Sequence, residues 1–327
     1  AGKQTTGEMV FKDQSGNGHD IQLYNFAFSG ESGYGKYEND FSKFNAHPSN
    51  IGQIVYKYNK IEVIGKLKNS FLTFSYSTNL ELNSTKIRVL NLPKNLVIYY
   101  RYVDSSYTQK TIIIRSNGIH DIPSSLLTEA AINVGFQVEY DSSVDYTGLT
   151  IEQIPEYQGA LVSDGIDDYG LCENFPAFPI EKGFTVCAIR GWISEKGTLI
   201  SKRNQGSFLD GAFTTENITE NSQGDILKTC INFGKKNLIL NYFNKNISFI
   251  YNTYLKYNGF TITSGDSQDT NIISIFSNYR GLIDKGSIAL YALEIYDRDL
   301  TDEEITKVKA RMIAEYESKT GNKYEEE

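Results

Sequence analysis

Three aspartates stand within a span of five residues in the segment "LVSDGIDDYGL", residues 161–171. Asp164, Asp167 and Asp168 lie beside a glycine, and carboxylate oxygens on such a loop suit Ca²⁺, which takes roughly six to eight oxygen ligands. The spacing is not that of an EF-hand loop. Turn formation is the alternative, because aspartate accepts hydrogen bonds from its own backbone and tolerates left-handed geometry. The sequence therefore predicts a tight turn whose carboxylates are candidate metal ligands, with Ca²⁺ as the cation.

A second segment, residues 242–260, is rich in tyrosine and asparagine. The chain has 23 tyrosines but one tryptophan, and Tyr242, Tyr251, Tyr254 and Tyr257 alternate here with asparagine and lysine. Aromatic rings beside amide donors suit a glycan, because a sugar exposes one apolar face and many hydroxyls. These four tyrosines are therefore candidate ligand-binding residues. Exposed tyrosines on a sheet are the alternative, since tyrosine favours pleated, half-buried surfaces.

The sequence contains none of the common catalytic motifs. It has three histidines and no G-x-S-x-G, H-E-x-x-H or phosphate-binding G-x-x-x-x-G-K-[ST] pattern. Two carboxylate pairs, Glu152 with Glu156 and Glu294 with Asp297, lack the spacing that a retaining glycosidase requires. On a strand, Glu294 and Asp297 would point to opposite faces. We therefore expect a protein that is not an enzyme and that requires no cofactor.

Charge and cysteine content limit the partners. The net charge of −8 and the isoelectric point of about 5.1 argue against nucleic acid, whose phosphates attract a basic face, and against docking to an anionic membrane. No apolar run is long enough to span a bilayer, so we expect no membrane insertion. Cys172, Cys187 and Cys230 form no C-x-x-C pair and are best explained as small buried residues, although one disulfide with an odd thiol stays open.

The candidate residues belong to a chain of short strands separated by Gly, Asn, Asp and Ser. In "FQVEY", Phe136 and Val138 alternate with Gln137, which is typical of a strand with one buried face. Many such strands with dense turn signals predict antiparallel β-sandwiches. The predicted strands cover residues 60–66, 69–77, 86–92, 95–103, 110–116, 136–142, 149–154, 184–193, 197–203, 227–234, 237–243, 247–254, 259–265, 271–279 and 286–297.

One helix is predicted, over residues 299–318. Thr301 and Glu304 form a capping box, and Leu300 and Ile305 are placed as a hydrophobic staple. Three acidic residues occupy the first turn, where the helix dipole favours them. An apolar stripe follows the helical period and predicts packing against a sheet: Ile305, Val308, Met312 and Tyr316.

Four segments occur in an order that resembles a known family. They are "DQSGNGHDIQL" at residue 13, "LVSDGIDDYGLCENFP" at 161, "GFTVCAIRGWI" at 183 and "SIALYALEIYDRDLTDEEI" at 287. In this order they resemble the concanavalin A-like, laminin-G-like jelly-roll family. The resemblance implies a jelly-roll sandwich, frequent Ca²⁺ binding, and recognition of glycans or proteins at the rim. The last strand has Ala and Leu where related sequences often have Asp, which departs from the Ca²⁺-site pattern.

The first two of these segments lie much farther apart than in the family. Residues 24–160, which are 137 positions, separate them, and strand-rich residues 51–154 fill the interval. We therefore predict an all-β chain of two domains. Residues 1–50 and 155–327 form a discontinuous laminin-G-like jelly roll with a short C-terminal helix, and residues 51–154 form an inserted Ig-like β-sandwich. Such an insertion is tolerated when the loop ends lie close together.

Two glycine-rich regions, "GNGHDIQLYNFAFSGESGYGKY" at residues 16–37 and "LTIEQIPEYQGALVSDGIDD" at residues 149–168, also resemble uncharacterised fibre-type proteins of phages and prophages of gut bacteria. The expected function is a non-enzymatic recognition module in a virion, part of a tail or head fibre that binds bacterial surface glycan or protein and contacts other virion proteins. Fibre proteins are often trimeric, so the resemblance also implies further copies of the chain, in a homo-oligomer, as partners. Two alternatives stay open. One is a structural or assembly virion protein without a ligand. The other is a secreted or cell-surface glycan-active enzyme or its carbohydrate-binding accessory domain.

Overall fold

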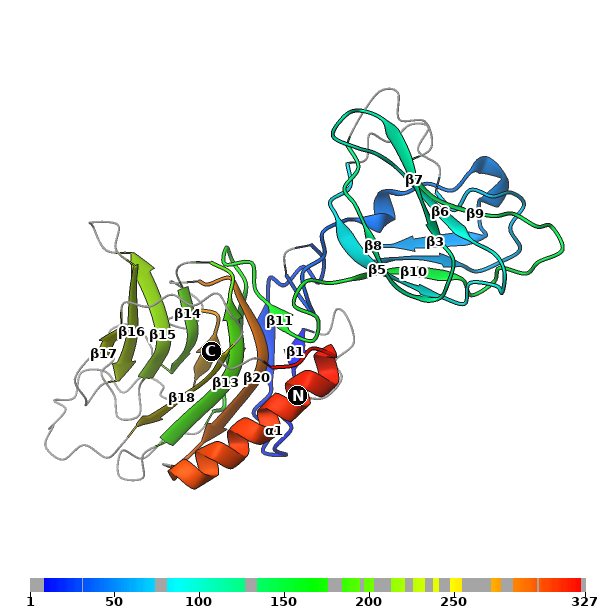
Figure 1. Ribbon diagram of the computed structural model, residues 1–327. Coiled ribbons are helices and arrows are strands. Elements are labelled where there is room, and N and C mark those ends of the chain that lie inside the picture. Colours follow the sequence, from blue (N-terminus) through cyan, green and yellow to red (C-terminus); the bar gives the residue numbers. More distant parts are fainter. Residues whose placement is uncertain are drawn as a thin grey trace, which may run out of the picture. The chain divides into compact units, whose positions relative to one another are not determined.

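The structure of the protein is a computed structural model (Figure 1). It describes residues 9–30, 32–73, 81–126, 134–175, 184–194, 197–202, 272–277, 285–298 and 300–324, and the backbone of four further strands between residues 213 and 254. The described residues form several antiparallel sheets and one C-terminal α-helix, which confirms the mainly-β prediction. The chain divides into two compact units, residues 1–35 with 157–327 and residues 36–156.

The first unit is built on two antiparallel sheets. Leu23 and Ile275 of the larger sheet and Val186 and Leu290 of the smaller one belong to one buried core. Trp192 lies in the same core with 2% of its surface exposed, so it is a core residue, as its strand predicts. The larger sheet has the order β1 (Val10–Phe11), β2 (Ile21–Tyr24), β12 (Tyr169–Cys172), β19 (Ile273–Ile275), β14 (Gly197–Lys202), β15 (Phe213–Glu220), β16 (Ile226–Asn232), β17 (Leu238–Leu240). The smaller has the order β11 (Leu161–Val162), β20 (Ile288–Tyr296), β13 (Phe184–Trp192), β18 (Ser248–Tyr254).

The helix α1 spans Asp302–Thr320 and confirms the prediction made from local sequence. The Thr301 hydroxyl accepts the Glu304 N–H, and the Glu304 carboxylate accepts the Thr301 N–H, which completes the capping box. Gly321 ends the helix in the left-handed conformation, with φ of 73°. The predicted stripe is buried against the four-stranded sheet: Ile305, Val308, Met312 and Tyr316. Among the described residues, no helix is long and apolar enough to cross a membrane.

The second unit has a five-stranded and a three-stranded sheet around its own core. Ile61, Ile87, Tyr100 and Phe136, which come from both sheets, are almost fully buried in it. The five-stranded sheet has the order β3 (Ile54–Lys57), β4 (Lys60–Val63), β10 (Thr150–Ile154), β5 (Thr85–Leu90), β8 (Gly118–Ile122). The three-stranded sheet has the order β7 (Gln109–Ile114), β6 (Ile98–Val103), β9 (Gly135–Val138). Short 3₁₀ helices cover Phe41–Lys43 and Pro48–Asn50.

Some strands differ from the prediction. The strands β3, β8 and β15 were not predicted, because β3 and β8 are short and β15 is mostly polar. They form because each pairs with a neighbouring strand: β3 with β4, β8 with β5, and β15 with β14. Of the predicted strand 69–77, Phe71 makes an isolated bridge to Gln137, and residues 74–77 lie outside the described part. The predicted strand 259–265 also lies outside it.

Residues 36–50 belong to the second unit in the structure, whereas the sequence analysis assigned them to the flanking domain. Phe41 and Phe44 are buried in the core of the second unit. The Gln153 Nε2 donates to the Asn39 carbonyl over 2.6 Å, and the Asn39 N–H donates to the Gln153 Oε1 over 3.0 Å. These contacts attach the entering segment to strand β10, where the unit ends. Phe41 and Phe44 lie outside any strand, so no alternating pattern in the sequence indicated that this segment belongs to the second unit.

Asp-x-Ser sequences build several of the turns. The Asp104 carboxylate accepts the N–H groups of Ser106 and Thr108, each over 3.0 Å. The Asp141 carboxylate accepts the N–H and the hydroxyl of Ser143. Hydrogen bonds from these serine side chains lower the pKa of both carboxyls. Both turns form from residues close in sequence, so their stability follows from local chemistry.

We expect residues 36–156, expressed alone, to unfold in one cooperative transition. Its ends are already paired, since the Lys36 N–H donates to the Glu156 carbonyl and the Glu156 N–H donates to the Lys36 carbonyl. The shorter segment 51–154 lacks Phe41 and Phe44, and each lost core phenylalanine costs about 3–5 kcal/mol. Circular dichroism during urea unfolding measures the difference. Equal stability of the two segments would contradict the role of residues 36–50.

Candidate metal and ligand site

The acidic turn, defined as residues 163–168, runs from β11 in the smaller sheet of the first unit to β12 in the larger one. Gly165 has φ of +77°, and a Cβ added to it would lie 2.8 Å from the Ser287 nitrogen. Glycine is therefore required by both conformation and space. The fully buried Ser163 hydroxyl donates to the Gly286 carbonyl and accepts the Ile288 N–H. The turn is thus fixed on the segment that leads into β20.

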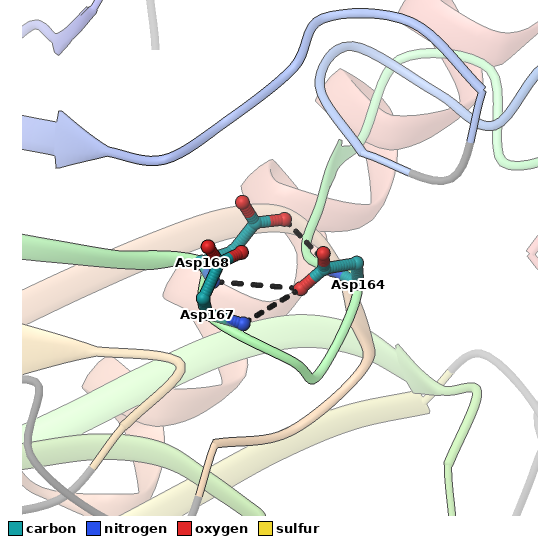
Figure 2. A group of neighbouring side chains, drawn as sticks. All are labelled: Asp164, Asp167 and Asp168. Atoms are coloured by element: carbon teal, nitrogen blue, oxygen red, sulfur yellow. Dashed lines mark hydrogen bonds between the residues drawn. The ribbon is translucent and has the colours of Figure 1, made fainter.

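Hydrogen bonds within the acidic turn confirm the predicted turn (Figure 2). The Asp164 Oδ1 accepts the N–H groups of Ile166, Asp167 and Asp168 at 2.8, 3.2 and 3.4 Å. In return, the Asp168 Oδ2 accepts the Asp164 N–H over 2.8 Å. These bonds hold Ile166 at the tip of the turn, where 77% of its surface is exposed. The backbone is therefore ordered by two of the three aspartates.

Asp168 is the unusual member of the trio. Its side chain is fully buried, and its Oδ1 has no hydrogen-bond partner. Burial raises the pKa of this carboxyl to about 7; the Asp164 N–H opposes the shift, and the Asp164 charge adds to it. The Ser32 hydroxyl also opposes the rise in pKa, but it forms no hydrogen bond with Oδ1. A buried carboxylate oxygen without a partner is costly unless a proton or a cation compensates it.

One oxygen from each aspartate can act as a ligand for the same cation. Such oxygens of Asp164, Asp167 and Asp168 lie within 4.8 Å of one another. Asp164 is half-buried, Asp167 is exposed and Asp168 is buried. The structure therefore brings the three predicted ligands together. Hard oxygen donors fit Ca²⁺, and the protein supplies three of the roughly six to eight oxygens that it takes, so the remaining positions would fall to water or to a ligand.

Aromatic and polar side chains surround the acidic turn, and the sequence analysis missed them. Tyr24 and Tyr169 are opposite each other in β2 and β12, and their rings stack with centroids 4.9 Å apart and planes 10° apart. The Lys285 Nζ lies 5.6 Å from the centre of the Tyr169 ring. The Asn25 Nδ2 donates to the Asp167 carbonyl over 2.9 Å. The pairing of β2 with β12 brings Tyr24 and Asn25 to Tyr169 and Asp167, which are far from them in sequence.

The first glycine-rich segment, residues 13–20, is a turn whose carboxylates are occupied. Asp13 accepts the N–H groups of Ser15 and His19 at 2.8 and 3.0 Å, and Asp20 accepts the Asp13 N–H and the Lys12 Nζ. The turn joins the short strand β1 to β2. Its hydrogen bonds explain the density of Asp, Ser and Gly without a ligand.

The predicted tyrosine site cannot be placed. Tyr242 and Tyr257 lie outside the described residues. Tyr251 and Tyr254 belong to β18, for which the structure describes the backbone but not the side chains. The prediction that these four residues bind a ligand therefore stays a prediction.

The carboxylates considered for glycosidase chemistry have other partners. Glu294 accepts hydrogen bonds from the Tyr296 hydroxyl and from Arg311 on α1, both over 2.5 Å. Glu152 lies 4.0 Å from Arg88, and Glu156 lies 3.8 Å from Lys36. Glu294 therefore attaches the helix to β20, and the other two belong to ion pairs of the second unit.

The described cysteines agree with the prediction of small buried residues. Cys172 and Cys187 are buried and free. Burial raises the pKa of the Cys187 thiol to about 12, so the thiolate is disfavoured. Cys230 lies in β16, whose side chains the structure does not describe.

Comparisons with known proteins identify no relative by sequence. No protein family matches the chain, and no curated protein matches it. Among solved structures, the chain matches a protein described as secreted, from Parabacteroides distasonis ATCC 8503, with a TM-score of 0.16 and 8% identity. That match covers 88% of this chain and 91% of the other. A likeness this weak assigns neither fold nor function.

The raised pKa of Asp168 predicts a pH-dependent stability. The carboxyl titrates near 3.8 when unfolded and near 7 when folded, so the folded state binds more protons between these values. Its contribution to the free energy of unfolding therefore falls as the pH rises from about 4 to about 7. Asp168→Asn removes this loss. With EDTA present, we expect the variant to gain stability over wild type by up to about 4 kcal/mol across that interval.

Urea unfolding of both proteins between pH 4 and pH 8 checks this expectation. Asp167→Asn is the matched control, because it removes an exposed carboxylate from the same turn. A stability difference between Asp168→Asn and wild type that stays constant with pH would show that the folded carboxyl has an ordinary pKa.

Proposed function

We propose that the chain is a non-enzymatic recognition module that binds glycan or protein at the acidic turn of the first unit. The observation that supports this most is the buried Asp168 Oδ1, which has no hydrogen-bond partner and lies beside two further carboxylates. The fold supplies no donor to this oxygen, so above the carboxyl's pKa of about 7 a bound cation would compensate its charge. We further propose that residues 1–35 and 157–327 form a concanavalin A-like, laminin-G-like jelly roll. Its two sheets, the turn between them and the final strand followed by a helix support that fold.

Ca²⁺ is the cation that we propose for the acidic turn. The Asp164 Oδ1 is engaged by three N–H groups, which leaves its other oxygen, the Asp167 carboxylate and the Asp168 Oδ1 as ligands. Bound Ca²⁺ would compensate the buried charge and attract ligand oxygens. The stacked Tyr24 and Tyr169 then offer an aromatic surface beside it for the apolar face of a sugar.

The biological setting is a proposal that rests on the resemblance of the two glycine-rich regions to phage and prophage fibres. We propose that the protein is part of a virion and serves host recognition, with a bacterial surface glycan or protein as ligand and other virion proteins, or further copies of the chain, as neighbours. Mass spectrometry of particles induced from a lysogenic host tests this. Finding the chain in the secreted fraction and not in particles would favour a secreted accessory domain instead.

Ca²⁺ should raise the melting temperature of the full chain, and more so at pH 8 than at pH 5. At pH 5 the Asp168 carboxyl, with a pKa of about 7, holds a proton that Ca²⁺ must displace. Asp168→Asn should abolish the increase. Scanning calorimetry with Ca²⁺ and with EDTA measures it, and Mg²⁺ serves as the control cation. An equal increase in wild type and Asp168→Asn would refute the site.

Glycan binding should need the tyrosine pair as well as the cation. We expect Tyr24→Ala and Tyr169→Ala each to weaken binding of any glycan that the wild type binds in Ca²⁺, because each removes one ring of the stacked pair on which the apolar face of a sugar would lie. Both variants should keep the Ca²⁺-dependent melting shift. A glycan array of bacterial surface polysaccharides identifies the ligand. No binding to the array or to host-cell surface protein would favour the structural virion protein, and release of reducing ends would favour an enzyme.

A further inference from the structure

A row of side chains crosses the outward face of the three-stranded sheet in the second unit. Ile113 of β7 lies opposite Tyr99 of β6, Tyr99 lies opposite Gln137 of β9, and Gln137 forms a bridge with Phe71. Successive side chains of a strand point to opposite faces. The residues adjacent to the row belong to the buried core, so the row faces away from it: Ile98, Tyr100, Ile114, Phe136, Val138 and Leu72.

Gln137 has an unsatisfied amide in the middle of this row. The residue is 5% exposed, and its Nε2 has no hydrogen-bond partner. It lies between the half-buried aromatic residues Tyr99 and Phe71. A buried amide nitrogen without an acceptor is unfavourable, so an acceptor oxygen supplied by a ligand would be bound strongly here.

An unpaired cation lies next to the row. Arg101 follows Tyr99 by two positions on β6 and therefore points to the same face. Its neighbours across the sheet are Thr111 and Gly135, which carry no charge. Within the part of the chain that the structure describes, Arg101 forms no ion pair. In a protein of net charge −8, such a cation favours a negatively charged ligand.

On the five-stranded sheet of the second unit, in contrast, charged side chains form ion pairs. On the outward face of the five-stranded sheet, Arg88 lies 4.0 Å from Glu152 and Lys86 lies 2.9 Å from Asp121. Lys60 lies 2.8 Å from Glu62 on the same face. The five-stranded sheet thus neutralises these charges by ion pairs within and between strands, whereas the three-stranded sheet leaves a cation and an amide donor beside an aromatic ring.

We propose that Tyr99, Arg101 and Gln137 form a second binding site, which takes an acidic glycan. The ring of one sugar stacks on Tyr99, and a carboxylate or sulfate on the sugar pairs with Arg101. The buried Gln137 Nε2 donates to a sugar oxygen once binding shifts the flanking side chains of Tyr99 and Phe71. A glycan fits better than an acidic peptide, because a peptide strand would pair with the backbone of the edge strand β7, while the unsatisfied groups here are side chains across the sheet. The site contains no carboxylate, so its binding requires no metal.

Isothermal titration calorimetry of the full chain in EDTA tests the proposal. The probes are oligogalacturonate for a carboxylate and chondroitin sulfate oligosaccharide for a sulfate, with neutral dextran as the control. We expect one of the two acidic glycans to bind and dextran not to bind. Arg101→Gln and Tyr99→Ala should each weaken that binding at least tenfold. Gln137→Met should also weaken it while raising the melting temperature, because it removes the unpaired donor and keeps the volume.

Matched controls separate this site from general charge and from the acidic turn. Arg88→Gln removes one cation from the opposite sheet and should leave the affinity unchanged, and Asp168→Asn should leave it unchanged too. Calorimetric melting of each variant verifies that it is folded. The proposal is overturned if neither acidic glycan binds, if Arg101→Gln binds as wild type does, or if poly-glutamate binds with the same affinity. Loss of Ca²⁺ binding at the acidic turn, by contrast, would leave this site intact.

Discussion

The antiparallel pairing of β2 with β12 is the contact on which the first unit depends. It places Gly170 next to Ile21, and the pairing of β12 with β19 places Gly170 next to Ile275. A Cβ added to Gly170 would lie 2.7 and 2.8 Å from carbons of these two side chains, so only glycine fits there. The pairing of β2 with β12 also places the turn of residues 13–20 at one end of the strand pair and the acidic turn at the other. Asn25, just after β2, donates to the Asp167 carbonyl, and Asn174, just after β12, donates to the Gly18 carbonyl. The residue that follows each strand thus supports the turn that precedes the partner strand.

The second unit lies in the chain between β2 and β11, and backbone pairs close the chain at both of its ends. In the first unit, Gly33 and Val162 exchange backbone hydrogen bonds of 2.9 and 2.7 Å, and in the second, Lys36 and Glu156 exchange bonds of 2.9 and 2.8 Å. Both ends of the interruption are therefore paired, and loop-closure entropy grows only slowly with the length between them. Each unit keeps a hydrophobic core of its own.

Aspartate has two opposite roles in this protein, and burial decides between them. Asp104 is half-buried and Asp141 is exposed; both accept local hydrogen bonds and have lowered pKa values, so they stabilise turns as ions. Asp168 also belongs to a turn, but it is fully buried with one oxygen unpaired, and its pKa is raised to about 7. Gln137 resembles it, as a buried side chain with one polar atom unpaired. Groups that folding leaves unsatisfied are the places where a ligand gains most, and both proposed sites are built around one.

The sequence by itself determined the features that depend on neighbouring residues. Alternation predicted most strands, the Thr301–Glu304 capping box and the apolar stripe predicted α1, and the Asp and Gly content predicted both turns. It also identified Asp164, Asp167 and Asp168 as candidate ligands, because the three residues belong to one turn and are close in the chain. Only the tertiary structure decided that Tyr24 stacks on Tyr169, that Phe41 and Phe44 pack in the second unit, and that Gln137, which alternation placed on a polar face, is buried. The physical reason is that hydrogen bonds within a turn are made between residues a few positions apart, whereas the register of strands and the burial of a side chain are set by partners more than a hundred residues away or on another sheet.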